Sequence, residues 1–389
     1  MIDAFRKLYG SAEGIRIYRA PGRVNLIGEH TDYNLGFVCP VALQLATYVA
    51  AAPSKDGKVR IYSEDRHEMR EFDAAAVAGL ERKAHWTDYP LGVARQLAAA
   101  GFGIEPVNLL IRSTVPEGSG LSSSAALEVS SALAFLAGRD FAPLELALLC
   151  QRAEREFVGM PCGIMDQYIS IFGRRDCAVE IDCRSLEHHD VQLPAGATFM
   201  AVNSMVKHAL AGSAYKERVQ ECAAAVEGIA RLFPAVHSLR DVSAEQYDAT
   251  LQSQLPPTVA RRARHVITED ARVEQFRAAG SAGDLKAMGR LMEESHRSLQ
   301  YDYEVSCPEL DFLVDRALRV EGVLGSRMTG GGFGGCTVTM LRPESVERFR
   351  EEISHAYEER FAVTPRFYEC RPSEGAGECQ NPELVHTAN

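Results

Sequence analysis

The sequence predicts a mixed α+β protein with two lobes. Its 389 residues exceed the length that one hydrophobic core usually serves, so two lobes with a cleft between them are expected. Predicted strands and helices alternate, but without the long βαβ series that a doubly wound parallel sheet requires. The run L-P-A-G-A near 192–196 interrupts the pattern. We therefore assign 1–194 to an N-terminal lobe and 195–389 to a C-terminal lobe.

The first half begins with strands. Runs rich in β-branched and apolar residues predict strands over 15–20, 37–52 and 107–115. After a glycine-rich turn, apolar residues at helical spacing predict a helix that begins near Ser122, with the stripe Ala126, Val129, Leu133 and Leu136. A second helix carries the stripe Leu146, Leu149, Ala153 and Phe157, and ends by 159–161. A third is predicted to begin at Ile164 and Met165.

The second half is mostly helical, with a few strands. Short strands are expected over 177–183 and 198–203, followed by a long helix with Ser213 as its N-cap. Residues 258–320 read as helical, with breaks near 280–283 and 307–308. Strands at 322–328 and 336–341 precede a helix at 344–359. The Pro, Glu, Gly and Asn content after about residue 372 predicts a mobile tail.

Composition narrows the function. A hydrophobic fraction of 46% and a charged fraction of 24% are typical of a folded soluble protein. The formal charge of -11 disfavours nucleic acid or an anionic membrane as a partner. An anionic substrate would therefore need a locally positive pocket. The ten cysteines form no C-x-x-C pair, and neither a signal segment nor a membrane-spanning run stands out, so we expect a cytoplasmic protein with reduced thiols.

The most informative stretch is P-G-R-V-N-L-I-G-E-H-T-D-Y-N-L-G, residues 21–36. It places Arg23, Glu29, His30 and Asp32 within ten residues, beside an apolar run. Two carboxylates and an imidazole can hydrogen-bond the hydroxyl groups of a sugar, and an arginine can stabilise an anion. This stretch therefore indicates a site for a polar ligand.

This stretch resembles, almost residue for residue, the signature of the galactokinases, which belong to the same superfamily of small-molecule (GHMP) kinases as homoserine and mevalonate kinases. The resemblance implies a GHMP kinase architecture. In that architecture an N-terminal lobe similar to ribosomal protein S5 and a ferredoxin-like C-terminal lobe hold the active site in the cleft between them. It also implies that Glu29, His30 and Asp32 orient a sugar, together with Gly163 and Tyr215.

The second constellation is P-E-G-S-G-L-S-S-S-A-A, residues 116–126. Its glycines permit close approach of a ligand, and its serines place amides and hydroxyls at a helix start, which favours an anion. It is not a Walker loop, and taken alone it is equally consistent with a helix cap after a tight turn. It resembles the phosphate-binding motif of the same superfamily, which implies nucleotide binding by Gly118, Ser119, Gly120, Leu121, Ser122, Ser123 and Ser124.

A glycine loop over 328–338, M-T-G-G-G-F-G-G-C-T-V, forms the third constellation. Such a run allows backbone shapes that are closed to other residues, and alone it fits a bulge or a crowded turn equally well. In the family, the loop abuts the phosphate site and closes the cleft. Family members often carry M-T-G-A-G-F-G-G, so Gly331 is a departure that should add flexibility without removing a contact.

Two acidic residues complete the expected machinery. Glu154 lies at the edge of an apolar helical stripe, where a glutamate is usually solvated, and Asp166 falls in the first turn of a helix, where capping is the ordinary role. The resemblance implies instead that Glu154 binds Mg²⁺ together with Ser122 or Ser123, nucleotide oxygens and waters. It implies that Asp166 is the catalytic aspartate, assisted by Arg23. The sequence leaves open whether Asp166 acts as a general base or only electrostatically.

Three aromatic residues also match family positions. Tyr215 in G-S-A-Y-K is expected near the sugar, with ordinary packing at a helix start as the alternative. Trp86 and Tyr89 in H-W-T-D-Y are expected beside the adenine ring, with a place in the core as the equal alternative for the single tryptophan. Further matches at 181–187 and 302–311 extend the resemblance over nearly the whole chain.

The function that the resemblance implies is phosphorylation of D-galactose at its C1 hydroxyl by ATP with Mg²⁺, giving galactose 1-phosphate and ADP, the first step of the Leloir pathway. A monomer is expected. One alternative is a sibling kinase for N-acetylgalactosamine, but M-P-C-G-I at 160–164 leaves less room for an acetamide than a glycine-rich stretch would. Another is a non-catalytic galactose sensor, which is disfavoured because 122–126 retains the complete serine–alanine motif.

Overall fold

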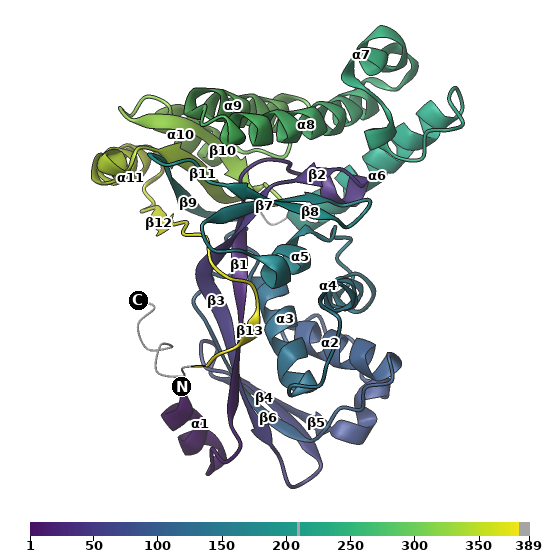
Figure 1. Ribbon diagram of the computed structural model, residues 1–389, viewed down its shortest axis with the longest axis vertical. Coiled ribbons are helices and arrows are strands. Elements are labelled where there is room, and N and C mark those ends of the chain that lie inside the picture. Colours follow the sequence, from purple (N-terminus) through teal and green to yellow (C-terminus); the bar gives the residue numbers. More distant parts are fainter. Residues whose placement is uncertain (208–210, 381–389) are drawn as a thin grey trace.

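A computed structural model describes residues 1–207 and 211–380. It confirms a mixed helix and strand protein in two halves, with a six-stranded sheet below and a four-stranded sheet with its helices above (Figure 1). The helices are α1 (Ile2–Tyr9), α2 (Asp88–Ala99), α3 (Ser123–Leu136), α4 (Pro143–Arg152), α5 (Met165–Phe172), α6 (Ala211–Ala230), α7 (Ala244–Gln246), α8 (Pro257–Ser281), α9 (Leu285–Tyr301), α10 (Pro308–Ala317) and α11 (Val346–Phe361).

The strands fall into three sheets, and all but one of the described strand pairs are antiparallel. The exception is β4 with β6. The strands are β1 (Arg16–Asn25), β2 (Phe37–Val38), β3 (Pro40–Pro53), β4 (Lys58–Ser63), β5 (Glu68–Asp73), β6 (Val107–Ser113), β7 (Cys177–Asp182), β8 (His188–Gln192), β9 (Thr198–Lys207), β10 (Val323–Thr329), β11 (Gly334–Leu341), β12 (Arg366–Glu369) and β13 (Gly377–Glu378).

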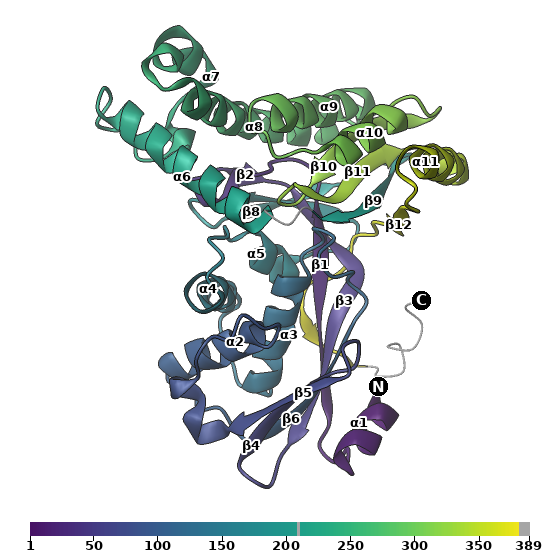
Figure 2. The same cartoon turned by 180° about the vertical axis from the view of Figure 1, so that it is seen from behind.

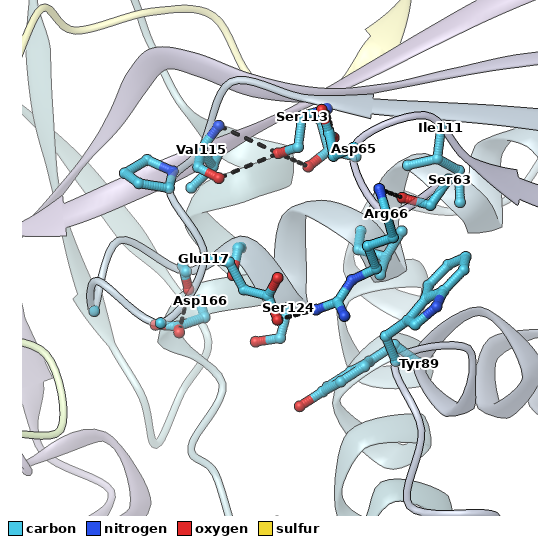
Figure 3. A pocket seen from close by; sticks show the side chains of 18 of the residues that line it. Ser63, Asp65, Arg66, Tyr89, Ile111, Ser113, Val115, Glu117, Ser124 and Asp166 are labelled. Carbon is cyan, nitrogen blue, oxygen red and sulfur yellow. Dashed lines mark hydrogen bonds and ion pairs between the residues drawn. The ribbon is translucent and has the colours of Figure 1, made fainter. Parts of the chain in front are cut away.

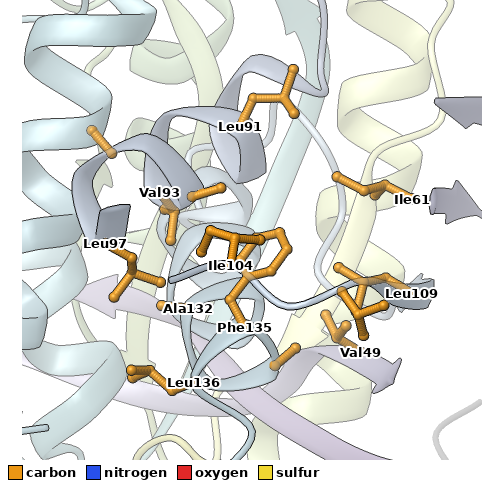
Figure 4. Packing of buried hydrophobic residues seen from close by; sticks show 14 of the residues in the cluster. Val49, Ile61, Leu91, Val93, Leu97, Ile104, Leu109, Ala132, Phe135 and Leu136 are labelled. Atoms are coloured by element: carbon orange, nitrogen blue, oxygen red, sulfur yellow. The ribbon is translucent and has the colours of Figure 1, made fainter. Parts of the chain in front are cut away.

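The lower sheet, in the order β13-β1-β3-β6-β4-β5, separates two apolar layers. Because side chains alternate along a strand, Tyr18 and Val49 face one layer while Ile17 and Tyr48 face the other. The first layer packs under α2 and α3, where Phe135 reaches into the cluster drawn in Figure 4. The second layer is covered by α1, which Figure 2 shows on the side of the sheet away from α2 and α3.

The upper sheet, in the order β10-β11-β9-β12, is also covered on both faces. Met200 and Val202 of β9 pack against α10 and α11, whereas Phe199 and Ala201 face a different cluster. That second cluster contains apolar residues of α8 and α9 together with Val24, Leu26 and Ile27 from the first half of the chain. The two halves therefore share a hydrophobic core.

Hydrogen bonds hold the segment after β1 against α8. The Glu269 carboxylate accepts from the amide nitrogens of Gly28 (3.0 Å) and Glu29 (3.3 Å), and Asp270 accepts from that of Phe37 (2.8 Å). Two arginines and the surrounding dipoles hold the pKa of Glu269 at about 2, even though the side chain is buried. The charged loop 28–37 is thus positioned by a helix from the other half of the chain.

The end of the chain departs from the prediction. A mobile tail after about 372 is wrong for residues 373–379, which return to the lower sheet, where Gly377 and Glu378 form β13 and pair with β1 (Figure 1). The rest of the predicted tail, residues 381–389, lies outside the described residues. Gly375 and Ala376 donate their amide hydrogens to Gly173 and Ser170 (2.9 and 2.7 Å), at the end of α5. These residues belong to the N-terminal half in space, so the 195–389 assignment is also wrong for them.

Other elements match or correct the expectations in detail. The boundary near 192–196 lies in the loop between β8 and β9, and the helical breaks near 280–283 and 307–308 are present. Ser213 is not an N-cap, because α6 already includes Ala211. The hairpin β4–β5 was not predicted. None of the helices in the described part of the chain has both the length and the apolar character needed to cross a membrane.

Candidate active site

Two cavities meet in the interior of the molecule. The larger, of about 560 Å³, is open to solvent and lies beside the N-terminus of α3, within the size range of small-molecule sites. The smaller, of about 150 Å³, lies beside the charged loop 28–37. Arg23, Asp166 and Gly331 line both of them. Segments from the start, middle and end of the chain therefore converge at one junction.

The predicted phosphate loop borders the larger cavity. Gly118, Gly120 and the serines at 122–124 line it, as do Trp86 and Tyr89. In Figure 3, Tyr89 lies on the opposite side of the cavity from Asp166, with Ser124 and Arg66 between them. The free amides at the start of a fourteen-residue helix favour an anion at this place. One end of the cavity is thus aromatic and the other suits phosphate.

Two residues of this loop point elsewhere. The Ser119 hydroxyl donates to the carbonyl of Pro116 (2.7 Å), and the Leu121 side chain is buried in the core shared by the two halves. Neither side chain lines the cavity, so the expectation that they bind nucleotide is limited to their backbone. Trp86 fits both roles considered for it, beside the nucleotide and in the core. It lines the cavity, packs against the core and donates its indole N–H to Glu68 (2.9 Å).

The glycine loop forms the turn between β10 and β11 and packs on the phosphate loop. Gly330 has a φ of 85°, and a Cβ placed on it would lie 3.0 Å from the carbonyl oxygen of Gly120, closer than most side chains approach a neighbour. At Gly331 the same test gives 3.5 Å to Tyr215, an ordinary contact. The first glycine is therefore required by close backbone approach, whereas the second is not.

Arg23 and Asp166 form an ion pair at the junction. Nη2 of Arg23 lies 2.8 Å from Oδ1 of Asp166, and Nη1 donates to the carbonyl of Gly120 (2.5 Å). The Ser122 hydroxyl donates to the other carboxylate oxygen of Asp166. Asp166 lies in the first turn of α5, as predicted, but it accepts from Arg23 and Ser122, and α5 has no side-chain cap. The capping alternative for Asp166 is therefore not supported.

The smaller cavity holds the predicted sugar-binding residues together. Glu29, His30, Asp32, Gly163 and Tyr215 all line it. The His30 ring packs 5.4 Å from that of Tyr215, centroid to centroid, and its Nδ1 lies 2.8 Å from the Tyr33 hydroxyl. Burial lowers the pKa of His30 to about 3, so the imidazole is neutral at neutral pH. A neutral ring can both donate to and accept from a hydroxyl group.

The carboxylates of Glu29 and Asp32 differ in the contacts that they already make within the protein. The Glu29 carboxylate accepts from Asn25, from the Thr329 hydroxyl (3.1 Å) and from the amide of Gly330. It therefore fastens the glycine loop as well as lining the cavity. Asp32 lies against Gly163, where any Cβ would overlap its carboxylate. Burial, together with the charge of Asp166, raises the pKa of Asp32 to about 7.

Glu154 is buried, which excludes a solvated role. It lies in a π-helical turn, η3 (Ala153–Val158), and such turns are often found at functional sites. Burial and the charge of Asp166 raise the pKa of Glu154 to about 7. A cation placed beside it would favour the charged form, and a glutamate with serine hydroxyls is the oxygen-rich set that Mg²⁺ prefers. The residues present therefore fit a magnesium ion.

The expectation that Ser122 or Ser123 shares that ion stays a prediction, and the structure adds Ser124 beside Glu154. Ser124 hydrogen-bonds the Glu154 carboxylate, whereas Ser122 turns to Asp166 because its backbone is left-handed (φ 65°). Within the described part of the chain, no three His, Cys, Asp or Glu side chains gather as a metal site, so nucleotide and water would supply the remaining ligands.

Some cavity residues were missed from the sequence. Ser63, at the end of β4, and Asp65 and Arg66, in the turn that follows, line the larger cavity. Arg66 also forms an ion pair with Glu117. Met160 and Cys162 line the smaller one. The alternation of Val59 and Ile61 could have identified β4 and thus the turn that follows it. Nothing local marks Arg66, because its place depends on the pairing of β4 with β6.

Known proteins resemble this chain along its whole length. The galactokinase galactose-binding signature matches residues 3–53, and the GHMP kinase N-terminal and C-terminal domains match 88–174 and 273–359. A galactokinase of Roseiflexus sp. (strain RS-1) is 48% identical over 378 residues, which cover 96% of this chain and 95% of that protein.

Solved structures agree. The crystal structure of Lactococcus lactis galactokinase complexed with galactose has a TM-score of 0.93 and 35% identity, and covers 97% of this chain and 98% of that one. A mevalonate kinase of Methanococcus jannaschii shares the fold, with a TM-score of 0.68 and 17% identity over 92% of this chain and 98% of that one. The expected GHMP kinase architecture is thereby confirmed, and the chain belongs to the galactokinase family of the GHMP kinases.

Proposed function

We propose that this protein transfers the γ-phosphoryl group of ATP to the C1 hydroxyl of D-galactose, giving galactose 1-phosphate and ADP. The observation that carries the proposal is the junction at which Arg23 and Asp166 border both cavities. Phosphoryl transfer depends on positioning and charge stabilisation more than on covalent chemistry by the protein. Two ligand cavities that meet at an arginine–aspartate pair suit that requirement.

The larger cavity would hold the nucleotide. Trp86 and Tyr89 offer aromatic surface for adenine, and the amides and hydroxyls of residues 118–124 lie where the triphosphate would sit. Mg²⁺, held by Glu154 and Ser124 together with nucleotide oxygens and waters, would offset the negative charge of the phosphates. Arg23 adds a fixed positive charge at the junction, where charge on the transferred group has to be stabilised.

The smaller cavity would hold the sugar. Asp32 and Glu29 accept from sugar hydroxyls, neutral His30 donates or accepts, and Tyr215 closes one side. The C1 hydroxyl would face Asp166, which orients it and takes its proton, while Ser122 and Arg23 hold the carboxylate in place. The absence of a side chain at Gly163 keeps Asp32 in position.

The decisive experiment is a panel of sugars incubated with ATP and Mg²⁺ and scored for phosphate on C1. D-galactose should be the preferred acceptor, with ADP released in equal amount. A preference for N-acetylgalactosamine would assign the chain to the sibling kinase. Sugar and ATP binding without ADP release would assign it to the sensor.

Location and assembly are part of the proposal. The ten cysteines are all free, and most of them are buried, which supports a reducing compartment such as the cytoplasm. We also propose that the protein is a monomer. Light scattering at the concentration used for the assay tests the monomer.

A further inference from the structure

Behind Glu154 lies a hydrogen-bonded group that the proposed reaction does not use. Nε2 of Gln167 donates to Oε2 of Glu154 (2.7 Å) and to Oε2 of Glu128 (2.9 Å). Glu128 and Gln167 are fully buried, and neither of them lines either cavity. The three side chains come from α3, η3 and α5. An effect of Glu128 and Gln167 on a bound ligand therefore has to pass through Glu154.

The chemistry of the amide explains why two carboxylates are needed. A glutamine side chain has two N–H groups and one carbonyl oxygen, and only the N–H side is attractive to a carboxylate. Here both N–H groups point at carboxylates, while Oε1 of Gln167 has no hydrogen-bond partner in the described residues. Glu128 thus sets which way the amide is turned, and the amide in turn fixes the Glu154 carboxylate.

Helical geometry places this group beside the reacting residues. Ser124 and Glu128 are four residues apart on α3 and so lie on the same face of that helix, where Ser124 contacts Glu154 directly. Gln167 follows Asp166 on α5, so one turn of that helix carries a carboxylate to the junction and an amide to Glu154. Glu154 is held from α3 and α5 together.

A purely structural role does not account for Glu128. An isolated buried carboxyl is unfavourable, and apolar side chains of similar volume usually serve a core better. Burial raises the pKa of Glu128 well above its usual range. Its Oε1 has no hydrogen-bond partner in the described residues. The contact that accounts for Glu128 is the one hydrogen bond that it accepts from Gln167.

We propose that Glu128 and Gln167 are positioning residues that orient the Glu154 carboxylate toward a divalent cation bound with the nucleotide. The inference rests on the proposed function, because it takes Glu154 as a ligand of that cation. Groups that hydrogen-bond a metal ligand in this way commonly change metal affinity by about 10–100-fold when they are removed.

The test measures cation binding directly. Mn²⁺ is titrated into the full-length protein with saturating ADP, and free Mn²⁺ is followed by its paramagnetic resonance signal. Gln167→Met and Glu128→Leu should weaken Mn²⁺ binding by about 10–100-fold. Gln167→Met removes the amide that holds the Glu154 carboxylate, and Glu128→Leu removes the acceptor that orients this amide. Glu128→Gln should bind Mn²⁺ nearly as wild type does, because its amide carbonyl still accepts from Gln167.

Controls separate positioning from folding. Ser131→Ala removes a buried hydroxyl that has no partner in the described chain, on the same helix, and should leave Mn²⁺ affinity unchanged. Galactose affinity, measured by calorimetry, should be unchanged in all four variants. Equal losses of galactose affinity, Mn²⁺ affinity and melting temperature in Gln167→Met and Glu128→Leu would mean a merely structural role and overturn the proposal.

The outcomes also separate this inference from the proposed function. If wild type binds Mn²⁺ with ADP and the two disruptive variants bind it equally well, the positioning role is wrong and the kinase proposal stands. If wild type binds ADP without any divalent cation, the metal site itself is wrong and this inference falls with it.

Discussion

The Arg23 guanidinium lies 2.8 Å from the Asp166 carboxylate and also donates to the carbonyl of Gly120. One side chain thus connects β1, the phosphate loop and the first turn of α5. Arg23 is almost fully buried, so its position is set by packing and not by solvent. The pair therefore presents a defined positive and a defined negative group to whatever occupies the junction.

Asp166→Asn should lower kcat by about 10²–10⁴-fold, the usual contribution of a positioned acid–base group. The amide keeps the shape of the side chain, so the dissociation constants for galactose and ADP should change little. Asp182→Asn is the matched control, because Asp182 pairs with Arg240 (2.9 Å) away from both cavities. Turnover near the wild-type value in Asp166→Asn would remove the carboxylate from the mechanism.

Gly163→Ala should impair sugar binding and spare nucleotide binding. The added methyl group would overlap the Asp32 carboxylate and displace it from the smaller cavity. Loss of a hydrogen bond to a charged group costs about 1.5–3 kcal/mol, so KM for galactose should rise roughly 10–100-fold. Gly163 lines only the smaller cavity, so KM for ATP serves as an internal control. Equal increases in both KM values would contradict this account.

Sequence reasoning recovered the site where the signal is local. Arg23, Glu29, His30 and Asp32 stand close together in the chain, and their glycine neighbours mark a turn, so their convergence on one cavity was predictable. The position of Asp166 in the first turn of a helix was predictable in the same way, because the residues next to it mark the start of that helix. What these residues contact was known only through the resemblance, because the contacts cross more than a hundred residues of chain.

The misses have distinct physical causes. Ser122 adopts a left-handed backbone that no sequence pattern marks at a serine, so the contact between Ser124 and Glu154 was not anticipated. Glu128 lies in an apolar helix, where a glutamate is read as a flank until its buried partner is known. The segment after 372 has the composition of a mobile tail, but its hydrogen bonds to α5 and β1 hold it on the lower sheet.

Asp270→Asn should stabilise the protein at pH 8 and not at pH 4. Burial raises the pKa of Asp270 to about 7 from 3.8, and its Oδ2 has no hydrogen-bond partner in the described chain. Between about pH 4 and 7 the folded protein therefore keeps a proton that the unfolded chain has lost. Wild-type stability consequently falls as pH rises through that window. Asparagine lacks this charge but still accepts from the Phe37 amide.

The stabilisation by Asp270→Asn can be measured by unfolding. The gain at pH 8 should be on the order of 2 kcal/mol in the free energy of unfolding. This is less than the full pKa shift of Asp270 implies, because the protein relaxes around a buried charge. Urea unfolding of both proteins from pH 4 to pH 8 measures it. A difference that is constant across that range would show that the charge of Asp270 is not the cause.

The glycine loop offers a paired test of where glycine is required. Gly331 has an ordinary backbone conformation, and a Cβ there would lie 3.5 Å from Tyr215, so Gly331→Ala should raise stability by about 0.4–1 kcal/mol. Gly332 has a φ of 79°, and its Cβ would overlap the carbonyl oxygen of Val305. Gly332→Ala should therefore destabilise the protein by more than that amount.

The same pair also bears on catalysis, since Gly331 lines both cavities. A methyl group that contacts Tyr215 would restrict the loop, so Gly331→Ala should keep kcat and leave KM for galactose equal or lower. Melting temperatures and steady-state kinetics of both variants give the comparison. If Gly331→Ala lost activity, the freedom of the loop at residue 331, and not its contact with Tyr215, would be what turnover requires.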